Sequence, residues 1–178
     1  MHHLFKNILA SLAILATLTS PAFAQQGRGP STPEEQARVV QLAATADKDP
    51  LGTMASEDGR WFEKWADDIP DYMFGPDSGA YWFMTKAAKG DLKRVLRFHH
   101  TVSTAAFQVK NHIADPTKDP AQMEAKTLAG VEGLLRAYES LLAKNPENRS
   151  AKLDEAIEIR NKGGLPAFVK ALPPMPER

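Results

Sequence analysis

An aromatic and acidic stretch is the first group of residues whose types could bind a ligand. All three tryptophans and five other aromatic residues fall between positions 61 and 83, with Asp67, Asp68 and Asp71 among them. Aromatic faces edged by carboxylates could form a pocket for a flat or sugar-like ligand. The same side chains could form core instead, because a small domain without disulfides must bury large apolar groups, and we favour that interpretation. The candidate ligand-binding residues of this stretch are Trp61, Trp65, Asp68, Tyr81 and Trp82.

The adjacent pair His99 and His100 is the second group. A helix turns about 100° per residue, so His99 falls inside an apolar stripe beside Ser103, and His100 falls at the edge of that stripe. A histidine in such a place could act as a general base or as a metal or haem ligand. Adjacent residues on a helix diverge, however, and no H-E-x-x-H motif accompanies them. We therefore predict a buried His99 bonded to Ser103 or to a backbone carbonyl, and keep His99 as the sixth candidate ligand-binding residue.

Other signatures of chemistry are absent from the sequence. It contains no Gly-rich phosphate loop, no G-x-S-x-G nucleophile elbow and no calcium loop. The lack of cysteine excludes disulfides, thiolate metal sites and c-type haem attachment. We therefore predict no catalytic residue, metal ligand or cofactor. The one cofactor alternative is a b-type haem held by His99 and a methionine such as Met84 or Met123.

The N-terminus has the pattern of a cleavable secretory signal peptide. An apolar run covers Ile8 to Leu18, and Ala22-Phe23-Ala24 places small residues around a larger one. Eleven residues are too few to cross a bilayer, which takes roughly 20. The sequence therefore predicts cleavage after Ala24, a periplasmic or secreted location and no stable membrane anchor afterwards. The 22 basic and 22 acidic residues balance, which argues against nucleic acid as a partner.

The elements that must position these residues are all predicted to be helices. Helical periodicity and capping residues predict helices over about 34–47, 59–69, 79–89, 92–113, 119–144, 150–162 and 165–172, with a loop over 50–59. In the longest of them a buried seam is predicted, flanked by small residues that let another helix approach: Leu128, Val131, Leu135, Tyr138 and Leu142, with Gly130, Gly133 and Ala137.

This pattern is typical of an all-α domain, either a compact helical bundle or a short stack of helical hairpins with about six helices. The predicted organisation is a signal peptide (1–24), a flexible leader (25–33), a single all-α domain (34–172) and a Pro-rich tail (173–178). The function class that we expect is a non-catalytic binding or cell-envelope support protein with a protein or peptide partner in the envelope. The alternative is a small-molecule-binding protein or hydrolytic enzyme that uses the 61–83 stretch with His99.

Overall fold

The computed structural model describes residues 28–75 and 77–174, and these are helical with no strand. Its α-helices are α1 (Pro33–Lys48), α2 (Pro50–Ala55), α3 (Glu57–Asp68), α4 (Ser78–Trp82), α5 (Gly90–Lys110), α6 (Pro120–Lys144), α7 (Ala151–Asn161) and α8 (Leu165–Lys170). An all-helical fold is thus confirmed for this part of the chain. The predicted signal peptide, residues 25–27 of the leader and residues 175–178 of the tail lie outside the described residues.

Local capping chemistry explains where several helices begin. The side chain of Thr32 accepts a hydrogen bond from the backbone N–H of Glu35, whose carboxylate in turn accepts one from the backbone N–H of Thr32. This reciprocal pair satisfies two of the backbone N–H groups that every helix leaves open at its start. Asp119 and Ser150 cap α6 and α7 more simply, since their side chains accept from the backbone N–H groups of Ala121 and Leu153. These three starts lie within a residue or two of the predicted ones.

Two helix predictions need correction. The predicted loop over 50–59 contains α2, which begins at Pro50, and α3 begins after Ser56 because the hydroxyl of Ser56 accepts from the N–H of Gly59. As a result the described residues contain eight α-helices instead of about six. The predicted helix over 79–89 is the short α4 followed by a π-helix, η1 (Phe83–Ala87), in which the N–H of Ala88 reaches the carbonyl of Phe83.

Helix α5 ends at Lys110, three residues earlier than predicted. His112 takes a positive φ of 53°, and the N–H groups of His112 and Ile113 bond back to the carbonyls of Val109 and Gln108. This is a Schellman motif, which closes a helix by turning its last carbonyls onto the reversed chain.

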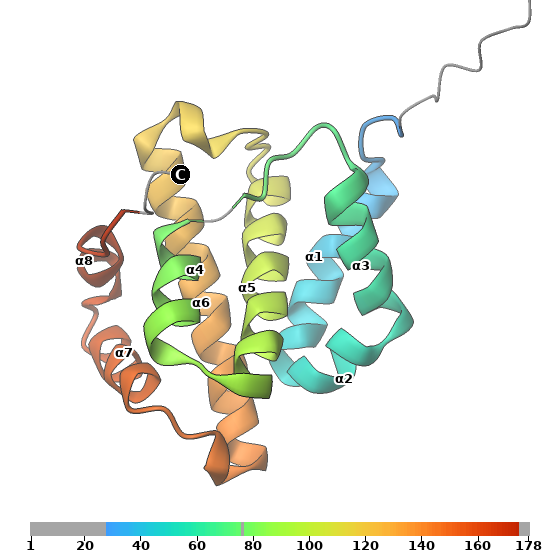
Figure 1. The fold of residues 1–178 in the computed structure, drawn as a ribbon. Coiled ribbons are helices and arrows are strands. Elements are labelled where there is room, and N and C mark those ends of the chain that lie inside the picture. Colours follow the sequence, from blue (N-terminus) through green and yellow to red (C-terminus); the bar gives the residue numbers. More distant parts are fainter. Residues whose placement is uncertain (1–27, 76, 175–178) are drawn as a thin grey trace, which may run out of the picture.

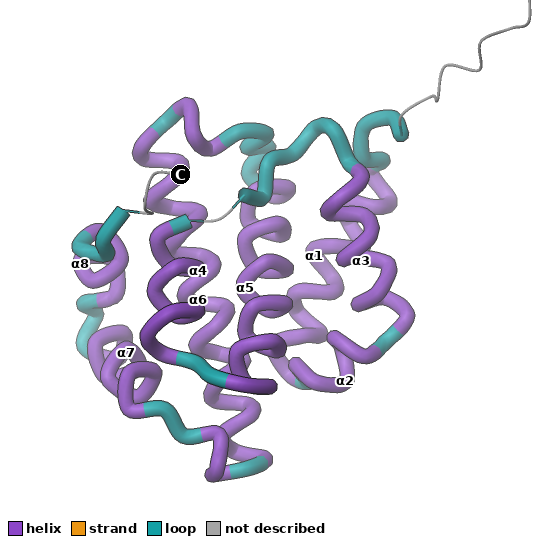
Figure 2. The backbone as a smooth tube through the Cα atoms, viewed as in Figure 1, coloured by secondary structure: helices purple, strands orange, loops and turns teal. Residues whose placement is uncertain are grey.

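Helices α5 and α6 pack against each other at the centre of the fold (Figure 1). Helices α1, α2 and α3 lie on one side of this pair and α4, α7 and α8 on the other, all joined by the short loops of Figure 2. One hydrophobic cluster joins α4 and η1 to α5–α8, and a second joins α1, α3 and α5. No helix of the described residues is both long and apolar enough to cross a membrane.

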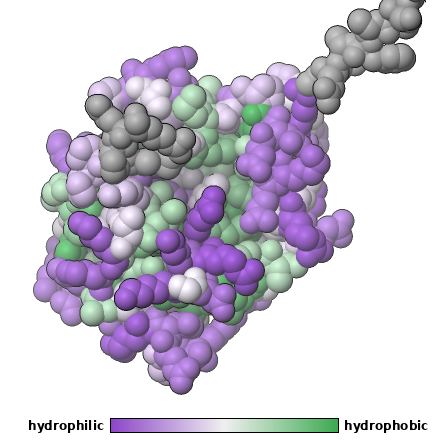
Figure 3. Space-filling model, viewed as in Figure 1, coloured by the Kyte–Doolittle hydropathy of each residue, from purple (hydrophilic) through white to green (hydrophobic). Residues whose placement is uncertain are grey.

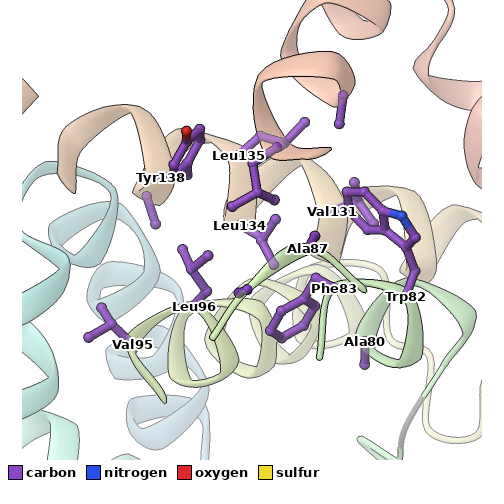
Figure 4. Close-up of a cluster of buried hydrophobic side chains, with 14 of the residues drawn as sticks. Ala80, Trp82, Phe83, Ala87, Val95, Leu96, Val131, Leu134, Leu135 and Tyr138 are labelled. Carbon is purple, nitrogen blue, oxygen red and sulfur yellow. The ribbon is translucent and has the colours of Figure 1, made fainter. Parts of the chain in front are cut away.

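The predicted seam of α6 belongs to the first of these clusters (Figure 4). Val131, Leu135 and Tyr138 are fully buried, whereas Leu128 and Leu142 are half-buried at its margin. The small residues beside the seam allow α5 to approach closely. A Cβ atom added at Gly130 would lie 2.6 Å from Nε2 of His100, so the backbone of α6 rests directly against that ring.

Candidate functional site

The aromatic stretch divides between the two hydrophobic clusters. Trp65 packs with α1 and α5, whereas Trp82 packs with α6 and α8 on the other side of the molecule. Trp61 and Tyr81 are half-buried, and Asp68 lies at the surface 2.6 Å from Lys64. Trp61 and Trp65 are in ring contact, with centres 5.8 Å apart, but the structure does not gather the five residues into one site, and none of them lines the clefts described below.

The sixth candidate, His99, is completely buried. Its Nδ1 lies 3.2 Å from Oγ of Ser103, which confirms the predicted partner. Its Nε2 lies 3.2 Å from Oδ1 of Asp47, and Oδ2 of Asp47 accepts a 2.8 Å hydrogen bond from Nε of Arg136. Nδ1 and the Ser103 hydroxyl are within hydrogen-bonding distance, whereas the contact between Nε2 and Oδ1 of Asp47 is close but not aligned as a hydrogen bond.

This arrangement ties α1, α5 and α6 together. Burial alone would raise the pKa of Asp47, but the contacts with His99 and Arg136 outweigh it and hold that pKa below its ordinary value of 3.8. Both ring nitrogens of His99 face buried side chains of the protein, although Nε2 and Oδ1 of Asp47 lack a well-aligned hydrogen bond, and this enclosed position does not suit the haem alternative. In residues 28–75 and 77–174 there is also no cluster of three or more potential metal ligands. We therefore assign His99 a structural role.

His100 has a different neighbourhood, although it too is buried, with only 5% of it exposed. Its Nε2 lies 3.4 Å from Oδ1 of Asp77, the N-cap of α4, which also accepts from the N–H of Ala80 at 2.9 Å. Nζ of Lys126 lies 3.8 Å from Oδ2 of Asp77 and donates to the carbonyl of Gly75 at 2.7 Å. A buried carboxylate thus stands between a buried histidine and a buried lysine.

Burial and the contacts of Asp77, His100 and Lys126 determine the pKa shifts of the carboxyl and the lysine. Burial would raise the pKa of Asp77, but His100, the backbone N–H of Ala80 and Lys126 together lower it below 3.8. Burial lowers the pKa of Lys126, and Asp77 offsets this only in part. Oδ2 of Asp77 and Nε2 of His100 are buried without a well-aligned hydrogen bond. The three side chains therefore lie close enough for their charges to interact, but they do not fill all of their hydrogen-bonding positions.

The orientation of the His100 ring follows from its neighbours. Gly130 of α6 faces the Nε2–Cδ2 edge, and the ring of Phe83 lies 5.5 Å away, centre to centre. The opposite edge, which carries Nδ1, therefore points away from α6. His100 also lines a cleft between α3, α4–η1 and α5.

This cleft has a volume of about 580 Å³. Its wall combines apolar and polar side chains: Ala66, Asp67, Phe74, Gly75, Ala80, Phe83, Met84, Arg97, His100 and Thr101. A second hollow of about 350 Å³ adjoins it, shares Ala66, Asp67, Arg97 and Thr101, and adds Glu63 and Arg94. Figure 3 shows hydrophobic surface between α3 and α4 on this face, bordered by hydrophilic side chains. We refer to the two hollows together as the α3–α5 cleft.

The position of Lys126 in the sequence could have predicted part of this site. Lys126 precedes Gly130, Gly133 and Ala137 at spacings of 4, 7 and 11, so it lies on the stripe of small residues that faces α5. A lysine on a buried stripe indicates a buried partner. The sequence shows Asp77 only as a possible cap of the predicted helix over 79–89, because nothing local connects it to a histidine 23 positions later.

No protein-family model, curated protein or solved structure matches this chain. The function must therefore be argued from the geometry of the site. An apolar cleft with a few convergent polar groups is the usual form of a small-molecule site. The α3–α5 cleft has this form, because its apolar wall is accompanied by arginines, carboxylates and the imidazole of His100.

Proposed function

We propose that this chain is an exported, non-catalytic ligand-binding protein whose site is the α3–α5 cleft. The observation that carries the proposal is His100, held by Asp77 and Lys126 at the wall of an otherwise largely apolar hollow. Its ring is packed on one side by Phe83 and on another by α6, so it is preorganised to contact a ligand.

The cost of this arrangement supports the proposal. Moving charged groups out of water costs several kcal/mol per ion, and well-packed apolar side chains of similar volume are often as stable or more so. The buried Asp77 and Lys126 are therefore poorly explained by stability alone. Perturbed titratable groups beside a cleft are instead a common mark of a functional site.

Filling the cleft tests the proposal. Ala66 is half-buried on α3 and lines both hollows, so a phenylalanine there would occupy ligand space. We expect the protein to enhance the fluorescence of N-phenyl-1-naphthylamine, a neutral aromatic probe, and Ala66→Phe to weaken this binding by about tenfold or more.

The matched control is Ala129→Phe. Ala129 is a half-buried alanine of α6 that lines a separate cavity of about 250 Å³ between α1, α5 and α6. This variant should bind the probe as the unaltered protein does. Thermal melts establish that both variants fold. Equal weakening by the two substitutions, or unimpaired probe binding by Ala66→Phe, would overturn the proposed site.

Export rests on the apolar run Ile8 to Leu18 and the Ala22-Phe23-Ala24 pattern that follows it. Mass spectrometry of the protein from an exporting host should find Gln25 as the first residue. Recovery of the uncleaved chain in the cytoplasm would contradict this part of the proposal.

A further inference from the structure

We infer that the ligand of the α3–α5 cleft is a zwitterion with an apolar side chain, which is the chemistry of a free apolar α-amino acid. The inference rests on the proposed function and specifies its ligand class. It follows from the opposite charges on the two walls of the cleft and from the apolar surface beside them.

The two walls carry opposite charges. Glu63 and Asp67 are four residues apart on α3, and Arg94 and Arg97 are three apart on α5, so each pair shares one helix face. All four side chains are exposed, and all four line the cleft. One wall is therefore acidic and the facing wall basic.

These charges do not neutralise one another across the cleft. In the described part of the chain no ion pair within 4.0 Å joins either arginine to a carboxylate. Asp68, the neighbour of Asp67, does pair with Lys64 on its own helix. The separation leaves room for a ligand that presents an ammonium group to α3 and a carboxylate to α5. A guanidinium suits the second contact because its planar donors match a carboxylate in two parallel hydrogen bonds.

The apolar part of the cleft lies beside this charged pair of walls. Phe74, Phe83 and Met84 line the larger hollow together with Ala66 and Ala80, and they offer a surface for an aliphatic or aromatic side chain. A ligand with only a negative charge would also face Glu63 and Asp67, and a ligand with only a positive charge would also face the arginines. A zwitterion avoids both unfavourable pairings.

Isothermal titration with three matched probes tests this inference. L-Phenylalanine carries both charges, 3-phenylpropionate lacks the ammonium group, and phenethylamine lacks the carboxylate. We expect L-phenylalanine to bind about three- to tenfold more tightly than either analogue, the range that exposed charge contacts give. Arg97→Gln should reduce its affinity to that of phenethylamine, and Asp67→Asn to that of 3-phenylpropionate. Arg60→Gln and Asp68→Asn, which alter exposed α3 charges that do not line the cleft, should leave it unchanged.

The outcomes separate the two proposals. If the three probes bind equally well, or if Arg97→Gln and Asp67→Asn bind L-phenylalanine as the unaltered protein does, the zwitterion inference is wrong and the binding cleft stands. The inference is also wrong if N-phenyl-1-naphthylamine binds the cleft and no member of the phenyl series does. If neither the naphthylamine nor the phenyl series binds, the proposed function itself fails.

Discussion

Two consecutive histidines on α5 are each met by a carboxylate from a different part of the chain. Asp47 at the end of α1 faces His99, and Asp77 at the start of α4 faces His100. Adjacent helical residues point about 100° apart, so the two rings lie in separate environments although both are buried. His99 connects helices in the interior, whereas His100 lines the cleft.

The lowered pKa of Asp47 makes its contribution to stability depend on pH. A carboxyl whose pKa is lower in the folded chain stabilises the fold above its unfolded value, and this stabilisation is lost as the pH falls through the folded value. Asp47→Asn should therefore lower the free energy of unfolding at pH 7. The difference from the unaltered protein should shrink below about pH 4. Urea unfolding at pH 7 and pH 3 measures this, and a difference that is the same at both values would contradict the assigned contacts.

For individual residues, the sequence predicted only contacts between side chains that are close in the chain. Ser103 follows His99 by four positions, so helical geometry alone places them together. Arg136 and Asp47 are 89 positions apart, and only the packing of α1 against α5 and α6 brings them together where Asp47 meets His99. The same reason explains why the Asp77–Lys126 contact could not be predicted.

At the scale of elements, strong local signals were sufficient. Helix α6 begins where Asp119 and Pro120 predicted, and Leu135 on its seam is fully buried. Weaker signals failed where the tertiary structure decides. The π-helix η1 interrupts an otherwise helical pattern, and its last turn is held from outside by Ser150, which donates to the carbonyl of Ala87. π-Helical turns are frequent at functional sites, and Phe83 and Met84 of η1 line the cleft.

The division of the aromatic stretch has its origin in the segment between α3 and α4. This segment is anchored at the end of α5: the N–H of Met73 donates to the carbonyl of Ala114, and Nε2 of Gln108 donates to the carbonyls of Met73 and Ile113. The chain thereby crosses α5 and delivers Trp65 and Trp82 to different hydrophobic clusters. A stretch that is continuous in sequence cannot form one pocket under this constraint.

At the scale of the whole molecule, the same crossing creates the cleft. Helix α3 and the α4–η1 segment lie on opposite sides of α5 (Figure 1), and the hollow between them exposes a face of α5 that carries Arg97, His100 and Thr101. We propose that the ligand binds in this hollow and not in a pocket formed by the tryptophan-rich stretch.

The most direct test is a ¹H–¹⁵N correlation NMR titration with 2-phenylethanol, an uncharged aromatic compound that tests the hollow without relying on the charged walls. The account predicts saturable shift changes centred on the amides of Ala66, Phe83 and Thr101, with little change at Ala43 and Ala129, which line the separate cavity. Shifts centred on Ala43 and Ala129, or no saturable shift at Ala66, Phe83 and Thr101, would contradict it.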